Sequence, residues 1–124
     1  MAITQTRPKR KVSGGRYKAY RKKRIYEIGH SPTKTKVGEV QTKKRRTRGG
    51  NPKKITLHTN TINLIIKGKP VKAKVLKVKE NTANRNYIRR NILTKGAIVE
   101  TDKGPAKITN RPGQEASING ILVE

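Results

Sequence analysis

The chain has 124 residues, the length of one domain, and carries 32 Lys and Arg against 7 Asp and Glu, a net charge of +25. Self-repulsion makes this excess a cost to a folded protein, so the composition indicates a polyanionic partner: most simply nucleic acid, with membranes or acidic polysaccharides as alternatives. The absence of Cys excludes a disulfide framework and a Cys-based zinc site, and His30 and His58 alone cannot complete a metal site, so we expect no metal and no cofactor.

Only 31% of the residues are hydrophobic, and Phe and Trp are absent, so the core must be small and built from Ile, Val, Leu and Ala. The longest aliphatic run, Leu64–Ile66, is far shorter than the roughly 20 residues that a membrane span needs. We therefore expect no membrane partner. A basic transit peptide is a weak alternative for the N-terminus, because Pro8 and Gly14-Gly15 interrupt any amphipathic helix there.

The first part of the chain is predicted to be a basic extension over residues 1–33, disordered when free, which precedes a β-domain over 34–124. Ala2–Gly15 reads as an extended arm that cannot bury enough apolar surface to offset its ordering entropy. In Arg16–Gly29, Tyr17 and Tyr20 alternate with cations, a pattern that suits RNA, since cations neutralise phosphate and rings stack on unpaired bases. We expect Tyr26 instead to pack on the core.

A dense basic run follows at Lys43–Arg48, where five of six residues are positively charged, and it ends in Gly49-Gly50-Asn51-Pro52. Such a run is commonly a solvated face or a localisation signal. The glycines predict a turn that lets backbone approach a ligand closely. We favour a basic hairpin tip or loop, within residues 43–54, that contacts phosphates.

The pattern from Lys54 onward predicts short strands. Strands are expected around Ile55–His58 and Ile62–Ile66, a turn at Lys67–Pro70, and a long strand from Val71. In that strand Val71, Ala73 and Val75 face one way, and a slip then makes Leu76 and Val78 the apolar positions, as a β-bulge would produce. Ala97–Thr101 and Ala106–Thr109 flank a turn at Asp102–Pro105, and Asn119-Gly120 predicts a two-residue hairpin. With no convincing helix, the fold class is mostly β, a compact barrel or sandwich.

The second candidate loop, Asn81–Lys95, is asparagine-rich and contains Tyr87, Arg89 and Arg90. It is predicted to be an ordered loop or short irregular element held toward an anionic partner; an ordinary surface connection is the alternative. No catalytic motif is present. Glu100 and Asp102 lie two residues apart beside a turn, which makes a small RNA-modifying or cleaving enzyme a weak alternative.

Four segments carry a family resemblance: GGRYKAYRKKRIYEIG, TKVG, RTRGGNPK and NTANRNYIRRNILTKGAIVET. They resemble the e-type family of small-subunit ribosomal protein eight of archaea and eukaryotes, over nearly the whole chain, and the short length resembles archaeal members. The resemblance implies a small closed or nearly closed β-barrel with an extended basic N-terminal arm. It also implies a cytoplasmic, non-catalytic constituent of the small ribosomal subunit whose partners are small-subunit ribosomal RNA and neighbouring ribosomal proteins, with no small-molecule substrate.

A general nucleic-acid chaperone or chromatin-like protein is the alternative to the ribosomal function. The residues expected to contact RNA are Arg7, Lys9, Arg10, Lys11, Arg16, Tyr17, Lys18, Tyr20, Arg21, Lys22, Lys23, Arg24, Lys43, Lys44, Arg45, Arg46, Arg48, Gly49, Gly50, Asn51, Lys53, Lys54, Tyr87, Arg89, Arg90, Lys95 and Arg111.

Overall fold

The computed structural model describes residues 3–123 and divides the chain into two compact units, unit 1 (Met1–Pro32) and unit 2 (Thr33–Glu124). Unit 1 contains β1 (Ile3–Thr4), the 3-10 helix η1 (Ile25–Glu27) and β2 (Ile28–Gly29), and β1 pairs antiparallel with β2. Residue 2 of the predicted arm lies outside the described residues. That the arm is disordered when free stays a prediction.

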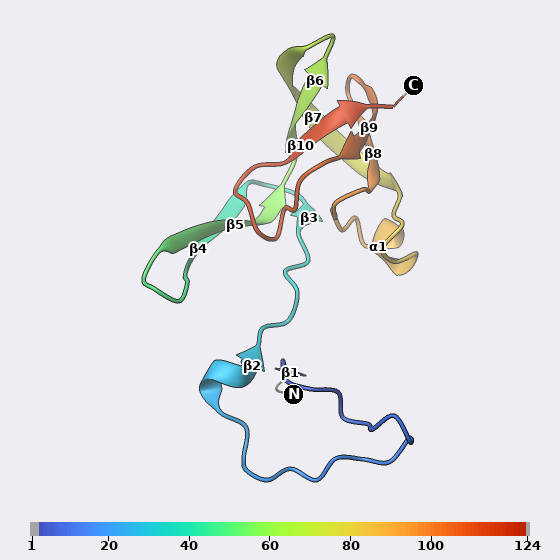
Figure 1. Cartoon of the computed structure of the whole chain (residues 1–124). Coiled ribbons are helices and arrows are strands. Elements are labelled where there is room, and N and C mark those ends of the chain that lie inside the picture. Colours follow the sequence, from blue (N-terminus) through green and yellow to red (C-terminus); the bar gives the residue numbers. More distant parts are fainter. Residues whose placement is uncertain (1–2, 124) are drawn as a thin grey trace. The chain divides into compact units, whose positions relative to one another are not determined.

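The regular elements described in unit 2 are β-strands, apart from one short helix (Figure 1). Its elements are β3 (Lys36–Val37), β4 (Gln41–Arg46), β5 (Pro52–Thr59), β6 (Thr61–Ile66), β7 (Lys69–Glu80), α1 (Asn86–Arg89), β8 (Ile98–Thr101), β9 (Gly104–Ile108) and β10 (Asn119–Leu122). Five strands close a barrel in the order β10-β6-β7-β8-β9, and β3, β5 and β4 form a second sheet. The predicted mostly-β fold and closed barrel are confirmed. No helix among residues 3–123 is long and apolar enough to cross a membrane.

The barrel core consists of Ile, Leu, Val and Ala, as the composition predicted. Leu64, Ala97, Val99 and Ala106 are fully buried at 0% exposure. These residues come from β6, β8 and β9 and from the segment before β8, so the core joins strands that are far apart in the chain. The barrel is therefore stabilised by burial of a small aliphatic core.

The predicted bulge in β7 is confirmed, but one of its residues faces the other way. Val75 pairs with Thr101 while Lys77 pairs with Glu100, so Leu76 is the extra residue in the ladder with β8. Leu76 is 60% exposed, and the prediction that it faces the core is wrong. Val78, only 4% exposed, is the residue that returns to the core. The bulge thus sends one apolar side chain outward so that its neighbours stay in register.

The predicted hairpin at Asn119-Gly120 is wrong. Gly120 lies inside β10, which pairs parallel with β6 and antiparallel with β9. A Cβ on Gly120 would lie 2.9 Å from Ile62 Cδ1 and 2.9 Å from the Lys107 carbonyl oxygen. The glycine is therefore needed for close approach of strands at this point of the barrel, not for a turn.

The turn predicted at Lys67–Pro70 is confirmed as the tight connection between β6 and β7. Lys67 (φ 47°) and Gly68 (φ 78°) are both left-handed, as a two-residue hairpin loop requires. A turn likewise joins β8 to β9 at Asp102-Lys103. The Gly and Pro pattern therefore located these two connections correctly, although it failed at Asn119-Gly120.

Candidate nucleic-acid interface

The basic run forms a β-hairpin, β4–β5, that extends from the barrel as a two-stranded ribbon (Figure 1). Lys44 lies directly opposite Lys54, and Arg45 lies directly opposite Lys53. Like charges opposite one another in a ladder are destabilising, by roughly 0.2–1 kcal/mol per pair. The free hairpin therefore carries an electrostatic cost that an anion lying between the paired cations would remove.

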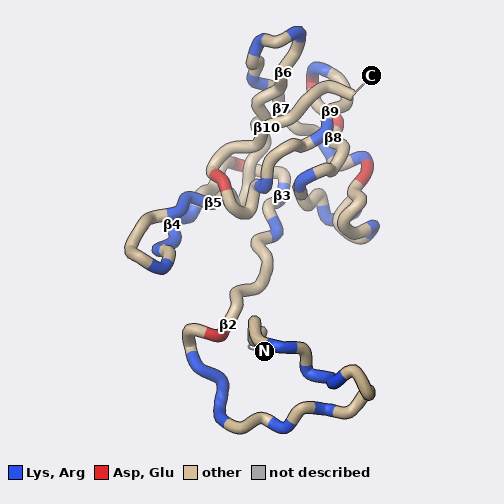
Figure 2. Tube along the Cα trace, viewed as in Figure 1, with Lys and Arg blue, Asp and Glu red and all other residues tan. Residues whose placement is uncertain are grey.

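In the part of the chain that the structure describes, no acidic side chain forms an ion pair with the four opposed cations, Lys44, Arg45, Lys53 and Lys54. Figure 2 shows the cations along both strands of the hairpin. Lys44, Arg46 and Lys54 are exposed, whereas Arg45 and Lys53 are half-buried. The Lys53 ammonium donates a hydrogen bond to Gln114 Oε1, a neutral partner that leaves its charge uncompensated.

The hairpin tip is closed by hydrogen bonds from Thr47 to the backbone of Asn51. The Thr47 amide (2.9 Å) and hydroxyl (2.8 Å) both donate to the Asn51 carbonyl. Gly49 and Gly50 have φ of 87° and 89°, a left-handed conformation that glycine adopts at no steric cost. The predicted hairpin tip is confirmed as structure, and its contact with phosphates stays a prediction.

Asn81–Lys95 is ordered, as predicted, and contains the short helix α1. Asn81, 8% exposed, holds the segment together: its Nδ2 donates to the Ile92 carbonyl (3.2 Å), while its Oδ1 accepts from the Ala83 amide (3.0 Å) and the Thr94 hydroxyl (3.0 Å). Ile92 and Leu93 are buried at 1% and 2% exposure. Asn81 therefore serves the fold, whereas the arginines of this segment are exposed.

Arg89, the last residue of α1, and Arg90, its C-cap, are exposed, as the sequence predicted. Arg85 is also exposed at the N-cap of α1, and the sequence analysis missed it although it lies in the same run. Tyr87 is half-buried, with the Lys34 ammonium 6.0 Å from its ring centroid. Tyr87 therefore offers less free ring surface than its position in the sequence indicated.

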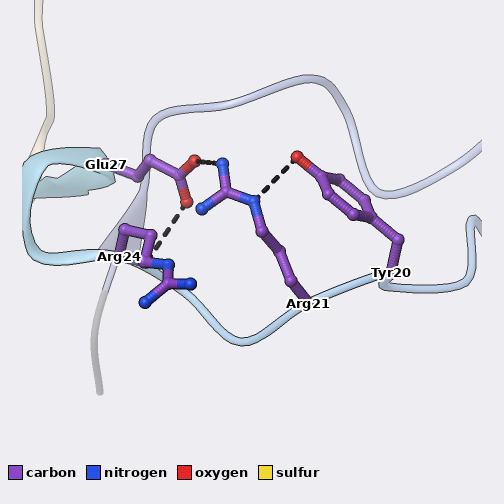
Figure 3. Close-up of polar contacts among 4 residues, drawn as sticks. All are labelled: Tyr20, Arg21, Arg24 and Glu27. Carbon is purple, nitrogen blue, oxygen red and sulfur yellow. Dashed lines mark hydrogen bonds and ion pairs between the residues drawn. The ribbon is translucent and has the colours of Figure 1, made fainter.

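The Tyr/Arg segment of unit 1 engages some of its own cations. Arg21 forms an ion pair with Glu27 and donates from Nε to the Tyr20 hydroxyl at 2.8 Å, and Glu27 Oε2 accepts from the Arg24 amide at 3.3 Å (Figure 3). Hydrogen bonds to Tyr20 and Tyr26, together with the Glu27 charge, raise the pKa of the Arg21 guanidinium above its ordinary value. Arg21 thus organises this segment before any ligand binds.

The tyrosines of unit 1 stay accessible. Tyr20 is 82% exposed, and Tyr17 is 40% exposed with the Arg7 guanidinium 4.0 Å from its ring centroid. Tyr26 is 62% exposed, so the prediction that it packs on the core is wrong. It belongs to η1 of unit 1, and its ring centroid lies 5.9 Å from the Arg21 guanidinium instead.

Unit 1 also contains a hollow of about 570 Å³. The residues that line it include Arg7, Lys9, Arg16, Tyr17, Tyr20 and Lys22.

The remaining predicted contacts are exposed but dispersed. Lys95 and Arg111 lie at the surface of unit 2, and the cations at 9–11, 16, 18 and 22–24 are exposed in unit 1. Within unit 2, the structure therefore gathers the hairpin residues on one two-stranded ribbon, whereas Arg111 lies in the separate loop between β9 and β10.

The acids that defined the enzyme alternative have structural partners. Glu100 forms an ion pair with Lys77 at 3.1 Å across the β7–β8 ladder. Asp102 Oδ1 accepts a hydrogen bond from the Lys74 amide at 3.1 Å. Among residues 3–123, no three His, Cys, Asp or Glu side chains gather in a group that could hold a metal ion.

Comparison with known proteins decides the family. Residues 4–123 match the family described as Ribosomal protein S8e. The chain belongs to the S8e family of ribosomal proteins. It is 52% identical to a protein of Methanobrevibacter smithii over 99% of this chain and 100% of that protein. It is 48% identical to one of Nanoarchaeum equitans (97% and 96% covered) and 47% identical to one of Methanocorpusculum labreanum (98% and 99%). All three are named small ribosomal subunit protein eS8.

Family membership confirms the resemblance seen in the sequence motifs, including its archaeal character. S8e proteins are structural components of the ribosome, which is cytoplasmic, and they are not enzymes. The enzyme alternative is therefore wrong. The expected role as a structural protein of the ribosome is confirmed, and RNA binding through phosphate contacts stays a prediction.

Proposed function

We propose that this protein binds and stabilises folded small-subunit ribosomal RNA through phosphate contacts and an inserted basic arm, as a constituent of the small ribosomal subunit. The three archaeal relatives are named for that subunit, and each aligns over nearly its whole length, which supports the same assembly for this chain. Neighbouring ribosomal proteins are the further partners in this proposal.

The observation that carries the proposal is the like-charge pairing of the β4–β5 hairpin. Lys44 faces Lys54 and Arg45 faces Lys53, without a compensating carboxylate in the described residues. A polyphosphate removes this repulsion and releases its own counterions when it binds, which supplies the affinity. A neutral or cationic partner would do neither.

The other exposed cations extend the contact. Arg89 and Arg90 are held at the surface by the ordered Asn81–Lys95 segment, so little backbone entropy is lost when they meet phosphate. In unit 1, Tyr20 is 82% exposed, which leaves room for an unpaired base to stack on its ring, a mode typical of RNA recognition. Arginine adds a planar fork that pairs with two phosphate oxygens or stacks on a base.

The test is the salt dependence of binding of the purified chain to a small-subunit ribosomal RNA transcript. If about ten cations reach phosphates, the plot of log affinity against log salt should have a slope near −7 to −9. Duplex DNA of equal length should compete poorly, and the protein should co-sediment with small ribosomal subunits in moderate salt. Equal competition by DNA would favour the chromatin-like alternative, and failure to co-sediment would contradict the ribosomal proposal.

A further inference from the structure

The hairpin cations are divided equally between the two faces of the β4–β5 ribbon. Directly opposed residues of an antiparallel ladder share a face, and successive residues of a strand alternate between faces. The register therefore defines two groups of three, which we call face A and face B. Face A carries Lys44, Arg46 and Lys54, and face B carries Lys43, Arg45 and Lys53.

This distribution differs from that of the barrel strands. In β7, Lys72 and Lys74 are exposed on the outer face, while Ala73 and Val75 between them are buried in the core. One face of β7 is thus available to a ligand. Ile55, which lies opposite Lys43 on face B, is buried at 3% exposure. Nearer the tip, neither face is part of the aliphatic core, and each face holds one opposed like-charge pair.

Each opposed pair points to an anion of its own. Opposed side chains start about 5 Å apart, so one phosphate can lie between Lys44 and Lys54, and a second between Arg45 and Lys53. Because the two pairs lie on opposite faces of the ribbon, one smooth phosphate backbone cannot pass both. A single RNA surface would relieve the repulsion on one face and leave it on the other.

We propose that the β4–β5 hairpin inserts between two phosphodiester segments of RNA and contacts one with face A and the other with face B. The inference rests on the proposed RNA-binding function and adds that the hairpin bridges two backbones. The six cations then neutralise both segments where they approach, so the ribbon holds together two pieces of RNA that would otherwise repel each other.

Two charge-matched variants of the full chain test the bridge. The face A variant combines Lys44→Gln, Arg46→Gln and Lys54→Gln, and the face B variant combines Lys43→Gln, Arg45→Gln and Lys53→Gln. Each removes three positive charges from the same two strands. A third variant, with Lys72→Gln, Lys74→Gln and Lys79→Gln on β7, removes three charges from outside the hairpin and serves as the matched control.

Two measurements separate bridging from simple affinity. The first is the salt slope of binding to the small-subunit ribosomal RNA transcript. The second is energy transfer between donor-labelled and acceptor-labelled RNA duplexes of about 20 base pairs mixed with the protein. We expect each face variant to reduce the salt slope by about 2 to 3 and to lose most of the energy transfer. The β7 control should keep more of the transfer than either face variant.

The inference is overturned if one face variant keeps the parent slope and the parent energy transfer, because that result means one-sided contact. It is also overturned if the β7 control loses as much transfer as the face variants, since bridging would then follow from total charge. If the parent fails to bind the transcript, the proposed function fails with it, which is a distinguishable result. Should a triple variant unfold in urea earlier than the parent, Lys44→Gln and Arg45→Gln alone, one per face, are compared in the same assays.

Discussion

The barrel and the β4–β5 hairpin of unit 2 are built from neighbouring strands but are stabilised in different ways. In the barrel, eleven Ile, Leu, Val and Ala side chains form a buried cluster. From Lys43 to Lys54 the hairpin has ladder pairing, while most of its side chains are exposed and several share one sign of charge with the residue opposite. Burial favours the barrel, whereas the hairpin's own side chains oppose its pairing.

The difference teaches that stability and binding are located in separate parts of one small domain. Substitutions in the barrel should change the free energy of unfolding and leave the RNA contacts of the folded protein intact. Substitutions in the hairpin should change RNA affinity and leave unfolding nearly unchanged. Each prediction below tests this separation, beginning with the change expected to have the largest effect.

Leu64→Ala should give the largest loss of stability. Leu64 is 0% exposed in β6, and removing a buried leucine side chain costs about 2–5 kcal/mol through lost burial and the cavity left behind. A small core supplies only about 3–5 kcal/mol in total, so the free variant should be largely unfolded at room temperature. Urea unfolding followed by circular dichroism measures the effect.

Leu76→Ala is the matched control, since it makes the same chemical change at the bulge of β7. Leu76 is 60% exposed, so its removal should change the unfolding free energy by less than about 0.5 kcal/mol. An equal loss in both variants would mean that the bulge residue is packed in solution, contrary to the register described here.

Gly120→Ala should be the next most damaging change. The new Cβ would lie 2.9 Å from the Lys107 carbonyl oxygen, a backbone atom of β9 that cannot rotate away. Overpacking of this kind costs about 1–3 kcal/mol, again measured by urea unfolding. Gly38→Ala is the control, because its Cβ would meet only His58, at 3.7 Å, and should be tolerated. A Gly120→Ala variant as stable as the parent would show that β10 is not packed against β6 and β9 as described.

Gly120 also shows where sequence reasoning reached its limit. Asn-Gly is the composition of a tight hairpin turn, but a glycine also occurs inside a strand that must approach its neighbours closely. The contacts that distinguish a turn from a close approach of strands are made with Ile62 and Lys107. Nothing in the sequence around Gly120 indicates that these residues lie next to it. Leu76 is similar: adjacent Val75 and Leu76 predict a slip in phase, but only pairing with β8 decides which one leaves the ladder.

For the candidate interface, the sequence predicted the basic hairpin but not the pairing of residues across it. Five cations in Lys43–Arg48 followed by two glycines predicted a basic hairpin, and β4–β5 has that form. The opposition of Lys44 to Lys54 depends on register across the turn, which composition does not specify. Tyr26 was assigned to the core from its apolar neighbours, yet it lies in η1 of unit 1 and is exposed.

Asn91 connects the arginine-bearing segment to the barrel, and its replacement should have an intermediate effect. Its Oδ1 accepts a hydrogen bond from the Val78 amide at 3.2 Å, beside a register shift of β7, and its φ of 48° is left-handed. Asn91→Ala should cost about 2 kcal/mol, because an amide loses its acceptor and alanine is strained there. Asn91→Gly should cost about 1 kcal/mol, because glycine adopts the left-handed φ without strain and only the hydrogen bond to the Val78 amide is lost.

Amide hydrogen exchange at Val78 separates these two causes. Both Asn91 variants should exchange faster than the parent at Val78, whereas only the alanine variant should also show the additional loss in urea unfolding. If exchange at Val78 is unchanged, the Asn91 side chain does not support the bulge, and packing of Ile88 and Leu93 against the core attaches the Asn81–Lys95 segment to the barrel instead.

Charge reversal at the Lys44–Lys54 pair should have the smallest effect on stability and an opposite effect on binding. Lys44→Glu or Lys54→Glu turns a repulsive cross-strand pair into an attractive one, which should slow amide exchange in β4 and β5 by an amount equivalent to roughly 0.2–1 kcal/mol. Either change should weaken binding to the ribosomal RNA transcript and reduce the salt slope by about 1.

The double variant Lys44→Glu/Lys54→Glu completes the cycle. It restores like charges across the ladder, so its gain in exchange protection should be smaller than the sum of the two single gains, and the shortfall is the coupling of the pair. Additive protection would mean that the two side chains do not sense each other across the ladder. In that case the hairpin carries no internal repulsion, and its cations would have to be explained by binding alone.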